Sequence, residues 1–524
     1  MLALVGESGS GKSVTALSIL RLLPQPPVRY TGGEIIFNDG APINLLRATP
    51  RQLQTIRGRR IGTVFQEPMT ALNPVMRCGQ QVAEVLMQHK HLSQQEAWSE
   101  TVQWFEKVRL PIPGVLAKRY PHQLSGGQKQ RVMIAMAMCC HPALLICDEP
   151  TTALDVTVQK GVLELIKTLQ HEYGTAVLFI THDLALVAKV ADDVAVLYKG
   201  RLVESGPTQK IFAAAQHPYT QALIACRPAA HPKSERLPTV SDYLDKEESS
   251  NSKNQVATHS VISGETLVSV ENLTVQYPAR KNFWGRTVQT FTAVDDVSFT
   301  ISKGETFGLV GESGCGKTTL GRTLLRLVEP TGGRIVIGGE DVTAKDEAAL
   351  KSFRKTAQLV FQDPYSSLNP RLTVADALSE PLAVYRLQPT AGERHKRVHQ
   401  LLDAVGLPAS AAQRYPHQFS GGQRQRIVIA RALALNPALL VCDESVSALD
   451  VSVQAQVLNL LNDLKKELGL TMLFISHDLS VVHYMCNRIA VMHGGKFVEL
   501  GTAHDVYHRP QSKYTQELIA AIPV

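Results

Sequence analysis

Two glycine-rich octapeptides have the residues that are needed to hold phosphate groups. GESGSGKS and GESGCGKT each follow a short apolar run and precede a helical pattern. In such loops, glycines turn backbone N–H groups inward around phosphate oxygens, the lysine adds a point charge, and the final Ser or Thr offers a hydroxyl to Mg²⁺. The predicted binding residues are Gly6, Glu7, Ser8, Gly9, Ser10, Gly11, Lys12 and Ser13, then Gly311, Glu312, Ser313, Gly314, Cys315, Gly316, Lys317, Thr318 and Thr319.

Acidic pairs end two later apolar runs, ALLICDEP and ALLVCDES. We predict that Asp148 and Asp443 hold Mg²⁺, directly or through water, and that Glu149 and Glu444 polarise an attacking water. An acid beyond a strand can also simply cap the next helix. The nearby phosphate loops favour the catalytic interpretation.

Gln66 and Gln362 stand where apolar strands end, just before an acid and a proline. A glutamine there could share a metal ligand shell and orient a water, or it could simply be a polar strand terminus. With these two residues, the predicted metal set is Ser13, Gln66, Asp148, Thr318, Gln362 and Asp443.

His182 and His477 follow a Ser or Thr and precede an Asp at the ends of two further predicted strands. A single histidine at such a place is more often structural. The repeated context suggests a polar contact to the transferred phosphate. The predicted catalytic set is therefore Glu149, Glu444, His182, His477, Gln66 and Gln362.

A nearly identical stretch, which we call the signature stretch, occurs at 120–132 (YPHQLSGGQKQRV) and 415–427 (YPHQFSGGQRQRI). A serine and glycines at a helix start leave N–H groups free to face an anion. A single copy could be an ordinary turn before a basic helix. Two copies, each between a phosphate loop and an acidic pair, favour a nucleotide contact. The residues concerned are Ser125, Gly126, Gly127, Gln128, Ser420, Gly421, Gly422 and Gln423.

Each half of the chain has to position one set of these residues, so the chain must be long enough for two domains. Its 524 residues suit two to four domains, and 44% hydrophobic with 19% charged residues is typical of a soluble globular protein. We find no long uninterrupted apolar run and no signal peptide, so we expect no membrane span and no export. The net charge of +7 is spread without a block, and the eight cysteines read as reduced core thiols.

The order of these motifs resembles the nucleotide-binding domains of ABC transporters in both halves. The FQ[ED]P segments and the tails HPYTQALIACRP and SKYTQELIAAIP look like those of the peptide/nickel import family. Two domains in one chain are similar to the fused ATPases of glutathione, oligopeptide and microcin-type importers. The resemblance implies an α/β fold: two tandem P-loop NTPase domains, each with a mostly parallel core sheet, an antiparallel β subdomain (truncated in the first half) and a helical subdomain.

The resemblance also implies a function. We expect ATP hydrolysis with Mg²⁺, at two composite sites formed head to tail, to energise peptide import through two membrane permease subunits and a solute-binding protein. The chain would lie on the cytoplasmic side of the inner membrane, peripherally, without nucleic acid or an iron–sulfur cluster. The alternative is a tandem ABC ATPase that acts on ribosomes or DNA. The short linker of mixed charge and the lack of paired cysteines disfavour it. The transported substrate is not written in this chain.

The predicted domains span residues 1–227 and 265–524, with a polar, flexible linker at 228–264. Aligning the phosphate loops leaves the first half without a counterpart of residues 267–305, which read as strands. Tyr277 in that stretch looks like the aromatic that stacks on adenine in this family. We expect either a start assigned too far downstream, which we favour, or a truncated first site with weaker ATP binding.

Overall fold

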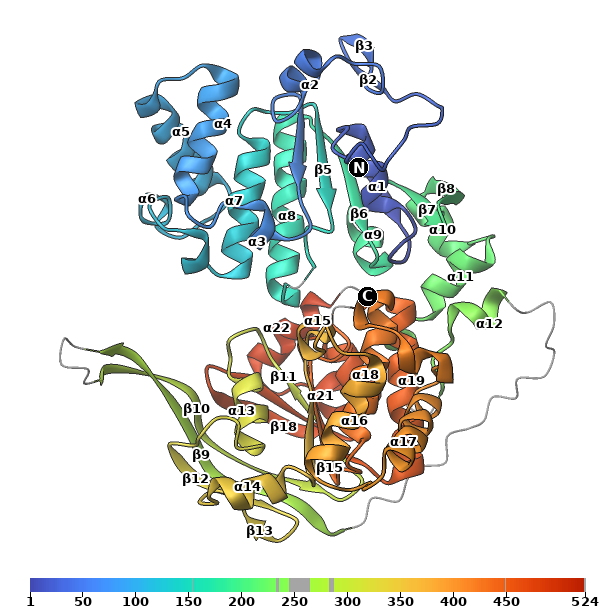
Figure 1. Cartoon of the computed structure of the whole chain (residues 1–524). Helices are drawn as coiled ribbons and strands as arrows, with labels where there is room; N and C mark the ends of the chain where they lie inside the picture. The colour runs from blue at the N-terminus through green and yellow to red at the C-terminus, as the bar shows by residue number, and fades with distance from the viewer. Residues whose placement is uncertain (153, 232–234, 245–263, 282–286, 448, 523–524) are drawn as a thin grey trace. The chain divides into compact units, whose positions relative to one another are not determined.

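The computed structural model describes the 524-residue chain except residues 153, 232–234, 245–263, 282–286, 448 and 523–524. The chain forms two compact units, residues 1–224 and 225–522. Each unit contains a six-stranded sheet with helices packed on it (Figure 1). The predicted α/β class with two repeated domains is confirmed.

The sheet of the first unit has the order β4-β5-β6-β1-β7-β8, parallel from β4 through β7 and antiparallel at β8. Apolar runs such as LLICD and AVLFIT form its centre because parallel strands are covered on both faces. Parallel strands place their carboxyl ends at one edge, where ligands bind in such sheets. The strands are β1 (Leu2–Val5), β4 (Ile61–Val64), β5 (Leu144–Asp148), β6 (Ala176–Thr181), β7 (Asp193–Tyr198) and β8 (Arg201–Pro207).

A helical insertion follows β4, as the sequence predicts. Its core is continuous with that of the sheet: Trp104, Phe105 and Phe179 belong to one buried cluster. The insertion consists of α3 (Pro68–Ala71), α4 (Cys78–Lys90), α5 (Gln94–Lys107), α6 (Pro113–Leu116) and the short 3-10 turn η1 (Pro121–Gln123). The other helices are α1 (Lys12–Ile19), α2 (Pro50–Ile56), α7 (Gly126–Met138), α8 (Val156–Tyr173), α9 (Leu184–Val190), α10 (Thr208–Ala213) and α11 (Pro218–Ala225).

The second unit repeats this plan with the sheet order β14-β15-β16-β11-β17-β18. Its strands are β11 (Thr306–Val310), β14 (Ala357–Val360), β15 (Leu439–Asp443), β16 (Thr471–Ser476), β17 (Arg488–His493) and β18 (Lys496–Thr502). Its helices are α13 (Lys317–Leu324), α14 (Glu347–Phe353), α15 (Pro364–Ser367), α16 (Val374–Val384), α17 (Ala391–Ala404), η3 (Ala409–Gln413), η4 (Pro416–Gln418), α18 (Gly421–Leu433), α19 (Val451–Leu468), α20 (Leu479–Met485), α21 (Ala503–His508) and α22 (Lys513–Ala521).

The units differ in their antiparallel sheets. The second unit has the order β10-β9-β12-β13, formed by β9 (Thr266–Lys281), β10 (Thr287–Ser302), β12 (Gly332–Ile337) and β13 (Glu340–Asp341). The described part of the first unit has only the hairpin β2 (Ile36–Asp39) and β3 (Ala41–Asn44). The smaller sheet leaves apolar surface open, since Leu2 is exposed whereas its counterpart in the repeat, Phe307, is fully buried. The expected difference between the two β subdomains is therefore present.

The segment after the first unit differs from the predicted flexible linker. Residues 228–230 form the 3-10 turn η2 (Pro228–Ala230), and α12 (Val240–Leu244) follows. Both belong to the second unit, where Leu237 is 1% exposed. A polar segment can be held in this way by a few buried groups, which its composition alone does not indicate. The rest of the predicted linker, 245–263, lies outside the described residues.

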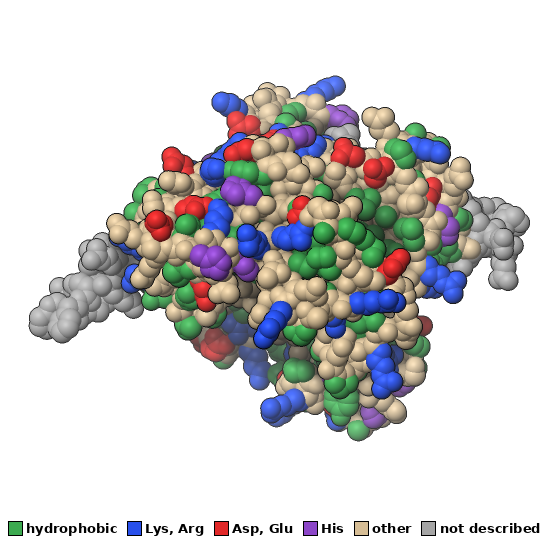
Figure 2. Space-filling view, turned by 90° about the horizontal axis from the view of Figure 1, so that it is seen from above, with side chains coloured by type: hydrophobic (Ala, Val, Ile, Leu, Met, Phe, Trp, Pro, Cys, Tyr) green, Lys and Arg blue, Asp and Glu red, His purple; other side chains and the backbone are tan. Residues whose placement is uncertain are grey.

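No helix in the described ranges is both long enough and apolar enough to span a lipid bilayer. Basic and acidic side chains interleave on the face seen in Figure 2, without a field of one sign. The spread of charge in the sequence is thus also found on this face.

Candidate active site: two repeated phosphate loops with acidic pairs

Each phosphate loop joins a central strand to a helix that begins at its lysine. Gly11 and Gly316 cap these helices in the left-handed region, with φ of 103° and 111°. Earlier in each loop, a Cβ on Gly6 would lie 2.3 Å from Leu197 O, and one on Gly311 would lie 2.2 Å from Met492 O. Only glycine fits between the loop and the neighbouring strand, so the loop path is fixed by sequence.

The loop lysines are buried and directed back at their own loops. Lys12 Nζ donates to Gly6 O at 2.6 Å and to Glu7 O at 3.0 Å. Lys317 Nζ makes the same bonds to Gly311 O at 2.6 Å and Glu312 O at 2.8 Å. Both ammonium groups therefore lie inside the loop whose N–H groups would surround a phosphate.

A hydroxyl and a carboxylate meet beside each lysine. Ser13 Oγ donates to Asp148 Oδ1 at 3.1 Å, and Thr318 Oγ1 donates to Asp443 Oδ1 at 2.9 Å. Burial raises the pKa of both aspartates, and the hydroxyl hydrogen bond opposes this rise. Hard oxygen donors of this kind are the ligands that Mg²⁺ prefers, so the residues present fit that ion.

The glutamate that follows each aspartate is held by the predicted glutamine and histidine. Gln66 Nε2 donates to Glu149 Oε2 at 3.0 Å, and His182 Nδ1 lies 3.3 Å from Glu149 Oε1. Burial favours the neutral acid, but the hydrogen bond and charge of His182, aided by Lys12, lower the pKa of Glu149 to about 2. Glu149 is thus an ionised carboxylate at neutral pH.

The second unit has the same arrangement. Gln362 Nε2 donates to Glu444 Oε2 at 2.7 Å, and His477 Nδ1 lies 3.5 Å from that oxygen. Burial again opposes ionisation of Glu444, but the hydrogen bond and charge of His477, with the charge of Lys317, lower its pKa. The structure brings the predicted lysine, hydroxyl, aspartate, glutamate, glutamine and histidine together in each unit.

The signature serines begin helices and bond within their own caps. Gln128 N–H donates to Ser125 Oγ at 3.3 Å, and Ser125 N–H donates to Gln128 Oε1 at 3.1 Å. Ser420 and Gln423 form the same reciprocal pair. These caps orient the first N–H groups of α7 and α18, an arrangement that suits an anion. None of the hydrogen bonds described for the two serines joins them to the phosphate loop of their own unit.

The signature glycines also have a packing role that the sequence did not suggest. A Cβ on Gly127 would lie 2.5 Å from Val158 Cγ1, and one on Gly422 would lie 2.1 Å from Val453 Cγ1. The second glycine of each pair is therefore needed for α7 and α18 to approach α8 and α19. The available signal was the valine that stands three residues after TALD (152–155) and after SALD (447–450).

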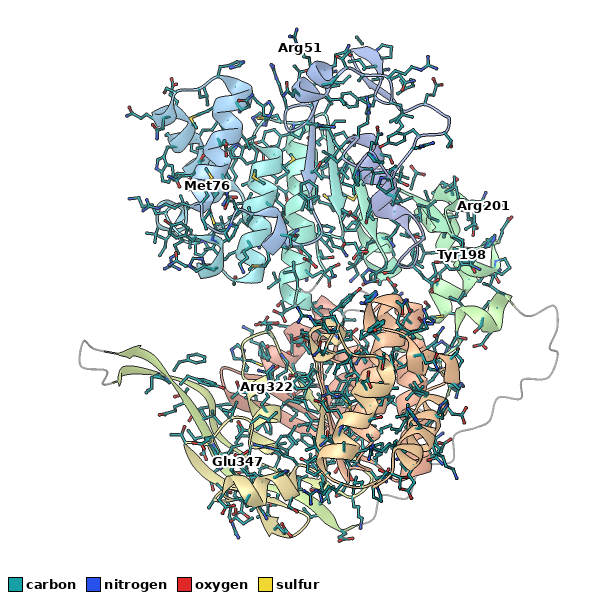
Figure 3. The ribbon with its side chains drawn as sticks, viewed as in Figure 1. Arg51, Met76, Tyr198, Arg201, Arg322 and Glu347 are labelled. Atoms are coloured by element: carbon teal, nitrogen blue, oxygen red, sulfur yellow. The ribbon has the colours of Figure 1, made fainter. Side chains whose placement is uncertain are left out.

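A tyrosine from each tail binds the phosphate loop, and sequence analysis missed this role. Glu7 N–H donates to Tyr219 Oη at 2.9 Å, and Glu312 N–H donates to Tyr514 Oη at 3.1 Å. Tyr198, labelled in Figure 3 at the end of β7, packs on Tyr219 with ring centroids 4.3 Å apart. The repeated YTQ of the two tails was the only sequence signal.

Tyr277 lies on β9 opposite Phe291 of β10, and its side chain is 38% exposed. Two residues after Phe291, Ala293 O lies 2.1 Å from where a Cβ on Gly316 would stand. The antiparallel sheet thus reaches the second phosphate loop. At the first loop, the nearest atom to such a Cβ on Gly11 is Gly200 Cα, at 3.9 Å.

Two P-loop domains, each with paired acids at a strand end, define a nucleoside triphosphatase with two tandem domains. Comparison with known proteins agrees with this class. The family model "ABC transporter" matches residues 1–152 and 294–447, and the model "Oligopeptide/dipeptide transporter, C-terminal region" matches 203–252 and 498–524.

Curated relatives match over the full chain. Glutathione import ATP-binding protein GsiA of Salmonella choleraesuis (strain SC-B67) is 48% identical over 100% of this chain and 84% of its own length. The protein of that name from Escherichia coli O6:H1 is 47% identical over the same shares. A solved dimeric ATP-binding cassette, in a post-hydrolysis state with ADP and Pi, is 30% identical over 45% of this chain and 99% of its own, with a TM-score of 0.41. The chain belongs to the ABC transporter family, and it is an ATPase with two ATP-binding domains.

Proposed function

We propose that this chain energises the import of peptides or peptide-like solutes through separate membrane permease subunits. The observation that supports this best is the similarity over the whole chain to relatives named as glutathione import ATP-binding proteins. The tail regions, which match the oligopeptide/dipeptide transporter C-terminal model, support the same choice of solute class.

The ATP would bind at two composite sites, each using the loop of one half and the signature stretch of the other. One site would use Lys12, Ser13, Gln66, Asp148, Glu149 and His182 with Ser420, Gly421 and Gly422. The other would use Lys317, Thr318, Gln362, Asp443, Glu444 and His477 with Ser125, Gly126 and Gly127. Both sites keep every catalytic residue type, so we expect both to hydrolyse ATP.

Mg²⁺ would be held by Ser13, Gln66 and Asp148 in one site and by Thr318, Gln362 and Asp443 in the other. When bound, it neutralises charge on the phosphates. The loop N–H groups and the lysine orient the terminal phosphate, and the ionised Glu149 accepts a proton from the attacking water. His182 and Gln66, which contact Glu149, keep this carboxylate aimed at the water. Tyr277 would stack on adenine at the second site.

The chain would bind two permease subunits at the cytoplasmic face of the inner membrane, and a solute-binding protein would deliver the peptide. No part of this function requires nucleic acid or an iron–sulfur cluster. The domain limits we propose are 1–227 and 265–524, joined by residues 228–264.

Co-expression with candidate permease subunits tests the function. We expect the protein to fractionate with membranes that contain the permeases, and we expect peptide with its binding protein to stimulate ATP hydrolysis. Control membranes without the permeases should retain none of it. Tight, salt-sensitive association with ribosomes or DNA, without membrane association, would instead support the alternative.

A further inference from the structure

Residues 235–244 follow the first half in sequence but are bound to the second unit. Leu237 N–H donates to Asn459 Oδ1 at 3.0 Å, and Asn459 Nδ2 donates back to Leu237 O at 2.8 Å. Tyr484 Oη donates to Glu235 O at 2.8 Å. Asn459 lies on α19 and Tyr484 on α20, so two helices of the second unit hold the start of this segment.

These contacts are buried. Leu237 is 1% exposed, and Asn459 and Tyr484 are each 2% exposed. A buried amide is costly unless its groups are paired, and the backbone of Leu237 satisfies both the donor and the acceptor of Asn459. The segment therefore supplies the hydrogen-bond partners that the buried polar side chains of α19 and α20 need.

The contacts differ in strength. Arg236 Nη1 lies 2.7 Å from Asp463 Oδ2, but the two side chains are 66% and 41% exposed, so solvent screens the pair. The buried bonds of Asn459 and the apolar burial of Leu237 should provide most of the affinity.

The surface belongs to the second unit alone. At the repeat offset of the signature stretch, Asn459 corresponds to Glu164 and Tyr484 to Lys189. Glu164 is exposed and cannot reproduce the paired donor and acceptor of a buried amide. The equivalent place on the described helices of the first unit therefore does not offer the segment this binding surface.

We propose that residues 235–244 are a docking segment that holds the first half on the second domain through Asn459 and Tyr484, without need of the covalent chain at 245–263. The division of the chain at 224 and 225 supports this, since Leu244 and Gly264, on either side of 245–263, both belong to the second unit. The chain at 245–263 then links two parts of one domain rather than two domains. The same surface would accept this segment from a separate chain.

A cut chain tests the proposal. The full-length protein receives a sequence-specific protease site in place of residues 250–256 and is cleaved without nucleotide and with a chelator, so that ATP cannot bridge the halves. We expect the two fragments to elute together as a one-to-one complex. Separation of the unsubstituted fragments at micromolar concentration would overturn the proposal.

Variants of the cleaved protein identify the surface. Asn459→Ala should weaken fragment association about 10- to 100-fold, because two hydrogen bonds are lost in a buried place. Tyr484→Phe removes one hydroxyl without altering packing, and it should weaken association about 3- to 10-fold. Arg236→Ala should change it by at most about 5-fold, and the matched control Glu164→Ala should not change it. Unchanged affinity in both Asn459→Ala and Tyr484→Phe would refute the assignment.

Discussion

At the scale of single residues, the two glutamates that we propose as catalytic are held in an unusual backbone conformation. Glu149 and Glu444 have φ of 47° and 46°, which non-glycine residues rarely adopt. Each N–H donates to the neighbouring strand, to Ile180 O and Ile475 O, both at 2.9 Å. A strained residue pinned on both its backbone and its carboxylate is typical of a site that positions a reacting group.

Replacing these carboxylates tests their role. We expect Glu149→Gln with Glu444→Gln to lower ATP hydrolysis about 10²- to 10⁴-fold, because the amide cannot accept a proton from water. ATP binding should remain, since the loop lysines are untouched. Phosphate release and nucleotide retention measure the two effects separately. Hydrolysis at a near wild-type rate in the double variant would contradict the assignment.

The tail tyrosines give a second prediction at this scale. Tyr514→Phe removes the acceptor of the Glu312 N–H, so the loop loses one anchor. We expect the KM for ATP to rise about 3- to 10-fold, with little change in melting temperature. Tyr219→Phe should act alike on the first loop, and Tyr385→Phe, on the helical insertion, is the control. If the KM for ATP is unaltered in both tail variants, the tyrosines do not support the phosphate loops and only pack against them.

The phosphate-loop and acidic residues could be predicted because their chemistry is local in sequence. Loop glycines, lysine and hydroxyl are consecutive, and the acids follow directly on an apolar run. Tyr219 is 212 residues from Glu7, and Tyr514 is 202 residues from Glu312. Contacts between residues so far apart in sequence depend on how the tail helix packs, and no local sequence pattern predicts that packing.

At the scale of elements, α18 is set close to α19 by Gly422. A Cβ there would stand 2.1 Å from Val453 Cγ1, whereas one on Gly421 would be 3.9 Å from Leu449 Cδ2. We expect Gly422→Ala to lower the free energy of unfolding by about 1–3 kcal/mol, as overpacking does, and Gly421→Ala to lower it much less. Denaturant unfolding of the full chain measures both.

Relief of the clash is the control for that prediction. Val453→Ala combined with Gly422→Ala should recover much of the lost stability, because the smaller side chain removes the nearest atom. If the two losses simply add, the contact between α18 and α19 is not the cause.

The strands and helices around the site could be predicted from motif order, and the segment after the first unit could not. Its composition is polar, and a polar composition is typical of a linker. What orders it is the burial of Leu237 together with hydrogen bonds from two side chains that are distant in sequence, Asn459 and Tyr484. A few buried long-range contacts do not change the average composition of a segment, so composition does not predict them.

At the scale of the whole molecule, the two units share one plan but differ around it. Both have the same sheet order and the same contacts among lysine, acids, glutamine and histidine. They differ in the antiparallel sheet and in the surface that binds residues 235–244. The two units therefore share the residues of the candidate site and differ in the elements that surround it.

The attachment of Leu237 to Asn459 also sets an order of events during translation. The two residues are 222 positions apart. At about 5–20 residues per second, the ribosome needs about 11–44 s to pass from one to the other. The first domain can finish folding in that interval while Leu237 still has no partner. On a polysome, the folded second domain of a chain further along in synthesis can then lie near the unbound residues 235–244 of the chain that follows it. Chains stalled before residue 459 should be cut within residues 235–244 by added protease, and released chains should not.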